Sequence, residues 1–190
     1  MIRVACIGSH GTGKTTLMDL LQKDLESREY RVLRVGSITR ELKELGVPIN
    51  QDGDLTMQVL SFALQYVELL KALKQENDYH YLLSDRSVYD DIAYLCCSMD
   101  IPLQQKYFLE TVINQSMSNF WTHVFYTPIK TVMENDGVRS EELEYQREVD
   151  IHVRSIFRSL EQSSSGTRLA TLDEVGFEQE LRKMLVCLGF

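Results

Sequence analysis

The chain has 190 residues, of which 44% are hydrophobic and 25% are charged, a composition that suits a globular domain and excludes a disordered chain. Its formal net charge of −8 disfavours a broad cationic surface for nucleic acid, because such binding depends on neutralising many phosphates. No apolar run approaches the roughly 20 residues of a membrane span, and no signal peptide is recognisable, so we expect a cytoplasmic protein that does not enter membranes.

The cysteines give no indication of a metal site in the sequence. Cys6 lies in an apolar run, Cys96 and Cys97 are adjacent, and Cys187 is near the C-terminus. Metal-binding motifs place cysteines and histidines at short, repeated spacings, which these four do not show. We therefore expect buried free thiols.

Five short apolar runs bounded by turn residues alternate with longer segments of helical periodicity. The runs predict strands at residues 3–7, 31–35, 81–84, 123–126 and 168–172. The first run is almost continuously apolar, as a strand covered on both faces should be. The pattern predicts a three-layer, doubly wound α/β fold with a parallel five-stranded sheet, formed as a single domain over residues 1–190. Ligands of such a domain bind beyond the carboxyl ends of the strands.

The first predicted strand leads into a phosphate-binding loop. Residues Gly8-Ser-His-Gly-Thr-Gly13-Lys14-Thr15 satisfy the pattern G-x-x-x-x-G-K-[ST], and an amphipathic helix follows. Backbone N–H groups of such a loop surround phosphate oxygens, the lysine reaches the β- and γ-phosphates, and the hydroxyl ligates Mg²⁺. The residues expected to contact the phosphates of Mg-ATP are Gly8, Gly11, Thr12, Gly13, Lys14, Thr15 and Thr16. We expect His10 to face solvent or the acceptor rather than to be catalytic.

The chain after the second strand offers contacts for a phosphoryl acceptor. A short helix is predicted to start at Ser37, where Arg40 is the best candidate for a cation that binds the acceptor. A long helix is predicted to begin after Asp54, its N-cap. On that helix, Gln65 could hydrogen-bond a base edge, but we expect it on the solvated polar face.

Charged residues follow the third predicted strand. Asp85 and Arg86 stand at its carboxyl end, which in this fold lies beside the phosphate-binding loop. We expect Asp85 to anchor Mg²⁺ or act as general base, and Arg86 to bind the acceptor; the alternative is a buried ion pair between them. Ser87 and Asp90 read as a capping box of the next helix, and Asp91 is a weaker candidate for the acceptor site.

A turn-forming, charged stretch near residues 134–148 suits a movable lid. Arg139 would point at the transferring phosphate, and Arg147 lies two helical turns further along the same predicted face. A solvated helix cap is the alternative for this stretch. The long helix over residues 141–160 carries an apolar stripe that should pack on the sheet.

Other nucleotide-binding classes fit poorly. A GTPase would need an N-K-x-D motif for its base, and the sequence lacks one. Oligomeric ATPase motors carry an additional helical domain, for which the chain leaves no room. These exclusions favour a kinase that transfers the γ-phosphoryl group of Mg-ATP to a nucleoside- or nucleotide-type small molecule.

Three motifs carry a resemblance to a known family: the segment from Gly8 to Thr16, the triplet Asp85-Arg86-Ser87, and Asp136-Gly-Val-Arg139 followed by Glu144-Tyr-Gln-Arg147. Together they resemble the AAA-type P-loop family of bacteria and their phages, which includes a ribosylnicotinamide kinase domain. The order of parts is also similar to thymidylate and deoxynucleoside kinases. The resemblance implies strand order 2-3-1-4-5, Mg-ATP as donor, Arg139 in the lid, and an acceptor between Arg40 and Asp85-Arg86.

The resemblance leaves the acceptor open. Deoxynucleoside kinases carry a catalytic glutamate just after the second strand, where this chain has Gly36-Ser37, so Asp85 or Glu41 would have to serve as base. Phage relatives of this type resemble kinases of a hydroxymethylated pyrimidine in DNA, which makes DNA an alternative acceptor. A non-catalytic ATP-binding module is a further alternative. The choice of ATP over GTP and the oligomeric state, a homodimer included, are also left open.

Overall fold

The structure, a computed structural model, describes residues 1–36, 38, 42, 46, 55–98, 101–117, 119–130, 140–163 and 166–190. Its sheet contains five strands in the order β2-β3-β1-β4-β5, and every neighbouring pair is parallel. The strands are β1 (Ile2–Ile7), β2 (Val32–Val35), β3 (Tyr81–Ser84), β4 (His123–Tyr126) and β5 (Arg168–Thr171). The strand order and the doubly wound fold predicted from the sequence are both confirmed.

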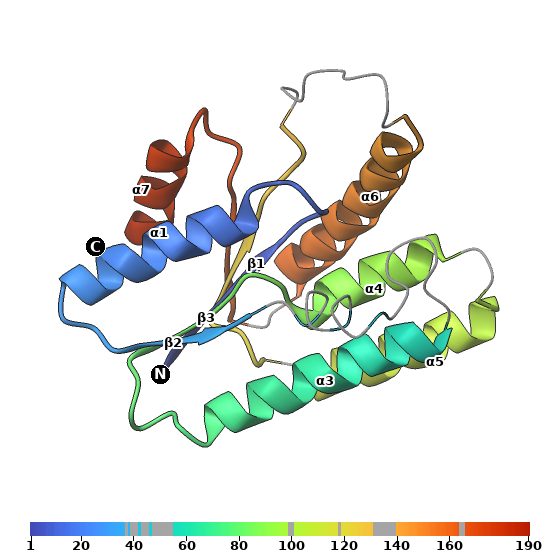
Figure 1. Cartoon of the computed structure of the whole chain (residues 1–190), viewed down its shortest axis with the longest axis horizontal. Coiled ribbons are helices and arrows are strands. Elements are labelled where there is room, and N and C mark those ends of the chain that lie inside the picture. The colour runs from blue at the N-terminus through green and yellow to red at the C-terminus, as the bar shows by residue number, and fades with distance from the viewer. Residues whose placement is uncertain are drawn as a thin grey trace.

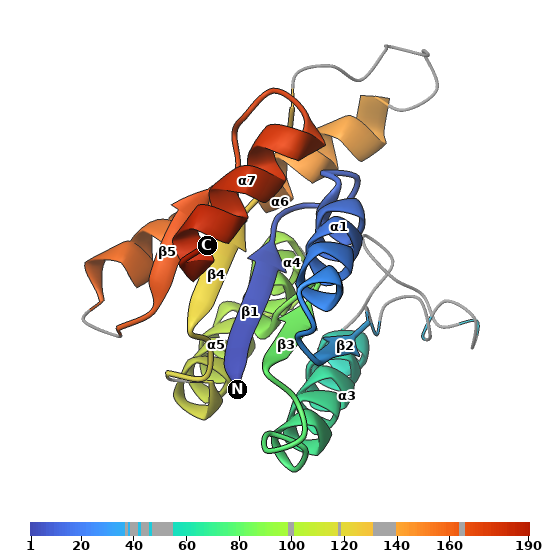
Figure 2. The same cartoon turned by 90° about the vertical axis from the view of Figure 1, so that its left-hand side faces the viewer.

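Helices cover both faces of the sheet, which gives three layers (Figure 1). One face carries α1 (Lys14–Ser27) and α7 (Phe177–Leu188), which lie in front of the strands in Figure 2. The other face carries α3 (Leu55–Leu73), α4 (Val88–Cys97), α5 (Leu103–Ser116) and α6 (Ser140–Gln162). None of the helices within the described residues combines the length and the apolar character that a membrane crossing requires.

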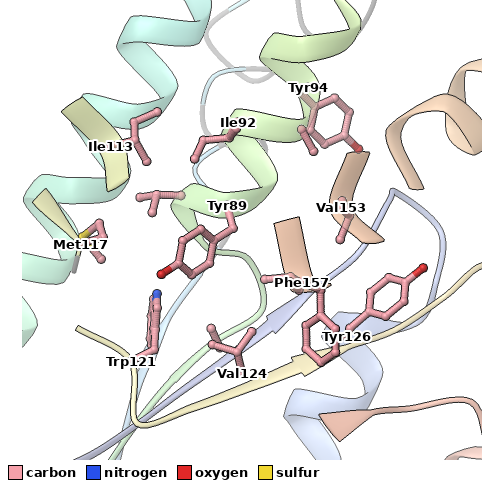
Figure 3. Packing of buried hydrophobic residues seen from close by; sticks show 14 of the residues in the cluster. Tyr89, Ile92, Tyr94, Ile113, Met117, Trp121, Val124, Tyr126, Val153 and Phe157 are labelled. Atoms are coloured by element: carbon pink, nitrogen blue, oxygen red, sulfur yellow. The ribbon is translucent and has the colours of Figure 1, made fainter. Parts of the chain in front are cut away.

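The core on the face of α3 to α6 explains why these helices hold fixed positions. Residues Tyr89 and Ile92 of α4 and Val153 of α6 are buried together with Val124 of the sheet (Figure 3). The predicted apolar stripe of the long helix is confirmed, because Val149 and Val153 are 0% and 1% exposed. Burial of such side chains contributes about 1.5 to 3 kcal/mol each and fixes the two helices against the sheet.

The structure corrects the prediction for Gln65. Its side chain is 3% exposed and donates to the Ser84 hydroxyl at 3.4 Å, so it does not belong to a solvated face. The helical pattern of α3 indicated its packing face, but it did not show that the end of β3 offers a polar partner there. Among the thiols, Cys6 and Cys97 are buried and Cys96 and Cys187 are half-buried; all four are free.

Several predictions fall on segments outside the described residues. They include the helix start at Ser37 with Arg40, the N-cap Asp54, and the part of the lid that holds Arg139. The division of the chain into a single domain, with a lid at about residues 134–148, stays a prediction.

Candidate active site

The phosphate-binding loop lies between β1 and α1 at the carboxyl edge of the sheet (Figure 1). Two of its glycines are required by the local geometry. A Cβ on Gly8 would lie 2.5 Å from the carbonyl oxygen of Thr127, which follows β4. Gly13 has φ of 86°, and a Cβ there would lie 2.7 Å from the Phe177 ring, so a side chain at either position would clash.

The loop is tied to neighbouring elements by buried hydrogen bonds. The hydroxyl groups of Thr12 and Thr127 lie 3.0 Å apart, and Thr12 also donates to the Ser9 carbonyl. The Gly8 N–H donates to one oxygen of Asp90 at 3.0 Å, and the Ser87 N–H donates to the other at 2.8 Å. Asp90 therefore completes the predicted capping box of α4 and also fixes the start of the loop.

The Lys14 ammonium is buried within the loop. It donates to the Gly8 carbonyl at 2.7 Å and to the Ser9 carbonyl. Burial lowers the pKa of Lys14 to about 8, while the nearby Asp90 carboxylate acts in the opposite direction. An ammonium in this position can exchange its carbonyl partners for the oxygens of an anion, whose charge would stabilise the protonated form.

Thr15 and Asp85 meet as the sequence predicts. The Thr15 hydroxyl donates to Asp85 Oδ2 at 2.9 Å, while Asp85 Oδ1 is buried and has no hydrogen-bond partner in the described part of the chain. The charge of Asp85 is balanced by Arg34 of β2, whose guanidinium lies 3.5 Å from Asp85 and 3.5 Å from Asp19 of α1. The alternative of an ion pair between Asp85 and Arg86 is not what the structure shows.

Arg86 instead lies against an aromatic ring. Its guanidinium carbon is 5.3 Å from the centre of the Tyr94 ring on α4, a cation–π distance. Burial disfavours its charge, but the surrounding Tyr94, Asp90 and Asp91 raise its pKa overall. Arg86 is therefore a fixed, half-buried cation beside the loop.

An aromatic group connects the loop with α4 and α6. His10 Nδ1 lies 3.3 Å from the Tyr94 hydroxyl, and the His10 ring stacks on Tyr145 with centres 6.3 Å apart. Beside Tyr145, the Gln146 amide donates to the His10 carbonyl. Helix α6, whose first turns overlap the predicted lid, is thus in direct contact with the phosphate-binding loop.

A pocket adjoins the opposite side of the loop. Phe177, at the start of α7, lies against Gly13, and the Lys130 ammonium lies 5.3 Å from the centre of its ring. The lining residues are Gly11, Thr12, Gly13, Ile129, Lys130, Gln146 and Phe177. An apolar ring beside a phosphate-binding loop is a suitable surface for a flat base.

Asp91 is turned toward α3. It accepts a hydrogen bond from the Ser61 hydroxyl at 2.9 Å, and burial raises its pKa to about 7. The neighbouring Asp90 acts in the same direction, while Arg86 opposes it. Asp91 can consequently exchange a proton near neutral pH.

The family profile described as AAA domain matches residues 3–164 of the chain. The chain belongs to the AAA domain family. No curated protein matches it, so the remaining similarities are to solved structures.

Solved structures share the fold of this AAA domain over nearly its whole length. Thymidylate kinase from Ehrlichia chaffeensis is similar with a TM-score of 0.72 at 15% identity, and the match covers 98% of each chain. Deoxyadenosine kinase from M. mycoides, with bound dATP, is similar with a TM-score of 0.68 at 17% identity and full coverage of both chains. NadR protein in complex with NR is similar with a TM-score of 0.71 at 17% identity, covering 100% of this chain and 52% of that one.

The structure brings together most of the predicted nucleotide-binding residues of this AAA domain. Gly8 to Thr16 form the loop and the first turn of α1, and Asp85 adjoins Thr15. Arg147 is exposed on α6, and its neighbours Tyr145 and Gln146 make the contacts with the loop. Arg40 and Arg139 lie outside the described residues, so their roles stay predictions.

Sequence reasoning missed residues that act through distant contacts. Arg34 lies inside strand β2, and charged residues are uncommon in buried strands, so this residue could have been recognised in the sequence as a candidate for a specific role. Tyr94, Tyr145 and Phe177 looked like ordinary helix residues, and no local pattern distinguished them. Their contacts depend on how α4, α6 and α7 are arranged around the loop.

Proposed function

We propose that this AAA domain is a phosphotransferase that moves the γ-phosphoryl group of Mg-ATP to a nucleoside- or nucleotide-type small molecule in the cytoplasm. The observation that carries the proposal is the meeting of Lys14, Thr15 and Asp85 at the carboxyl edge of the sheet, with the cation Arg86 next to them. The end-to-end likeness to a thymidylate kinase and a deoxyadenosine kinase supports a kinase over other P-loop classes.

The residues around Thr15 fit a magnesium ion. Mg²⁺ prefers oxygen ligands, and the Thr15 hydroxyl and the Asp85 carboxylate supply them in adjacent positions. Asp85 Oδ1 is buried without a partner among the described residues, which is costly unless a ligand satisfies it. The ion, when bound with ATP, neutralises charge on the β- and γ-phosphates.

The protein groups position the donor and stabilise the transferring charge. Backbone N–H groups of the loop and of the first turn of α1 face the phosphates, and Lys14 supplies a positive charge at the β- and γ-oxygens. Arg86, held by Tyr94, and Arg139 from the lid are the cations for the transferring group and the acceptor. Arg40 is proposed to bind the acceptor from the other side, with Asp91 and Arg147 at its margin.

The need for a base depends on the acceptor. A nucleoside hydroxyl must lose a proton, for which Asp85 or Glu41 would serve, whereas a phosphate acceptor is already anionic. The net charge of −8 argues for a small acceptor, because a protein that holds DNA needs many phosphate contacts.

The proposal is tested by incubating the protein with Mg-ATP carrying a labelled γ-phosphate and separate acceptors. Nucleosides, nucleoside monophosphates, and duplex DNA with and without hydroxymethylated pyrimidines form the set, with Lys14→Ala as control. We expect label in a nucleoside or nucleotide product only with the wild-type protein. Label found in modified DNA alone would identify a DNA-base kinase. Binding of Mg-ATP without transfer to any acceptor would contradict the proposal in favour of a non-catalytic module.

A further inference from the structure

Three side chains with metal-binding atoms meet between α4 and α6, outside the site described above. Cys97 is the last residue of α4, and Glu148 and His152 are one turn apart on α6. The Cys97 sulfur, one Glu148 oxygen and one His152 nitrogen all lie within 4.8 Å of one another. The cluster could not be recognised in the sequence, because Cys97 is more than fifty positions from Glu148 and His152 and meets them only through helix packing.

The distances are close to those of a bound zinc ion. Zinc binds sulfur at about 2.3 Å and nitrogen or oxygen at about 2.0 to 2.2 Å in a tetrahedron, so its ligand atoms lie about 3.4 to 3.6 Å apart. A separation of at most 4.8 Å therefore requires side-chain movements of about an ångström. Glu148 is exposed and His152 is half-buried, so both can rotate toward the buried Cys97 without displacing the core.

The side chains have little else to bind. Within the described residues, neither the Glu148 carboxylate nor the His152 ring has a hydrogen bond or ion pair. Other charged side chains of the protein do form such contacts, for example Arg154 with Asp150 and Lys183 with Asp173. The Glu148 carboxylate lies beside the buried Cys97 sulfur, so a thiolate formed there would place two negative charges close together. A bound cation would balance the negative charges of the buried thiolate and the adjacent carboxylate.

We propose that Cys97, Glu148 and His152 form a binding site for a thiophilic divalent ion of the zinc class, with water as its fourth ligand. A thiolate and an imidazole select such an ion over Mg²⁺, which prefers oxygen and belongs with Thr15 and Asp85. The two sites therefore do not compete for the same metal.

The position of the ion would link α4 to α6 near the nucleotide. Glu148 lies one turn after Tyr145, which stacks on His10 of the phosphate-binding loop. Figure 1 shows α4 and α6 side by side on the same face of the sheet. An ion held by both helices would fix the helix that carries the lid relative to the loop.

Cobalt is the probe that tests the site, because Co²⁺ replaces zinc and its bond to a thiolate absorbs in the near ultraviolet. The full chain, freed of metal by a chelator, is titrated with Co²⁺ in excess Mg²⁺. We expect a thiolate-to-cobalt band that saturates at one ion per chain and disappears when Zn²⁺ is added. Absence of the band at millimolar Co²⁺ would overturn the proposal.

Four variants identify the ligands. Cys97→Ser should abolish the band, whereas Cys96→Ser, at the adjacent thiol, should leave it unchanged. Glu148→Gln and His152→Gln should each weaken Co²⁺ binding by about tenfold or more, because each removes one of three protein ligands. A band that survives in Cys97→Ser, or that is lost in Cys96→Ser, would contradict the assignment.

Thermal unfolding gives a second readout that does not depend on Cys97→Ser being folded. Zn²⁺ that binds only the folded chain raises the unfolding temperature. We expect this rise in the wild-type protein and in Cys96→Ser, and its loss in His152→Gln, whose side chain is half-buried at the surface of α6. An equal rise in all three proteins would place the ion elsewhere.

Discussion

The nucleotide side of the site and its helical side are built in different ways. On the nucleotide side, Lys14 bonds carbonyls five and six residues away, so a short stretch of chain shapes its own anion site. On the helical side, His10 contacts Tyr94 and Gln146, which are 84 and 136 positions away. Substitution of Lys14 should therefore act chiefly on phosphate chemistry, whereas substitutions on the helical side act through packing.

The sharpest test of the nucleotide side is Lys14→Ala. The ammonium acts on phosphate charge, so phosphoryl transfer should fall by about 10³-fold or more while the fold is retained. Removing a buried cation should not destabilise the protein, which thermal unfolding checks. Lys23→Ala, at an exposed lysine of the same helix, should leave the rate unchanged. A wild-type rate in Lys14→Ala would refute the assignment of the loop.

Asp85→Asn keeps the volume of the side chain and removes its charge. Turnover should fall by about 10²-fold or more, and more Mg²⁺ should be needed, because an amide is a weak ligand for the ion. Asp19→Asn is the matched control, since Asp19 also pairs with Arg34 but, among the described residues, the Thr15 hydroxyl donates to Asp85 and not to Asp19. Equal losses in both variants would mean that the ion pair with Arg34, rather than the metal, explains the effect.

Arg139 extends the comparison to the predicted lid. If its guanidinium meets the transferring group, Arg139→Ala should lower the catalytic constant by roughly 10²-fold and ATP affinity by less than about tenfold. Arg139→Lys should recover little, because an ammonium lacks the planar two-pronged contact. The two constants are measured with the identified acceptor. Unchanged turnover in Arg139→Ala would remove the lid hypothesis and leave a solvated helix start.

The pH dependence of ATP binding is a further test of the nucleotide side, because it reports the protonation of Lys14. Below its pKa of about 8, Lys14 is protonated in the free protein and in the complex, so it adds no pH dependence. Above that value only the complex keeps the proton, because phosphate raises the pKa, and ATP affinity should fall by up to about tenfold per pH unit. Calorimetry between about pH 7 and 9.5 measures this slope. The same slope in Lys14→Ala would assign it to another group.

The contrast between local contacts and contacts of distant segments also explains how much of the fold could be predicted from the sequence. All five strands were found within a residue or so of their bounds, because buried parallel strands are continuous apolar runs between turn residues. The phosphate-binding loop was found because its function requires glycines, a lysine and a threonine at fixed local spacing. The strand order came from the resemblance to a family rather than from periodicity.

What the sequence did not reveal depends on tertiary contacts. Gln65 is buried because the Ser84 hydroxyl at the end of β3 accepts its amide, and no property of its own helix indicates this. Arg34 contacts Asp85 because β2 and β3 are neighbours in the sheet. The cluster of Cys97, Glu148 and His152 likewise exists only once α4 packs against α6.

Tyr94 tests the helical side and should show the smallest effects. Its ring holds Arg86 at 5.3 Å and its hydroxyl contacts His10, so two substitutions separate the two roles. Tyr94→Phe keeps the ring and should reduce kcat/KM by about threefold or less, because one modest hydrogen bond is lost. Tyr94→Leu also removes the cation–π contact and should lower kcat/KM by about tenfold, with most of the change in the KM of the acceptor.

Tyr145→Phe is the control. The buried hydroxyl of Tyr145 has no partner among the described residues, so its loss should leave kinetics unchanged and stability equal or higher. If Tyr94→Phe and Tyr94→Leu are equally impaired, His10 rather than Arg86 depends on Tyr94, and the helical side acts through the loop instead of the acceptor.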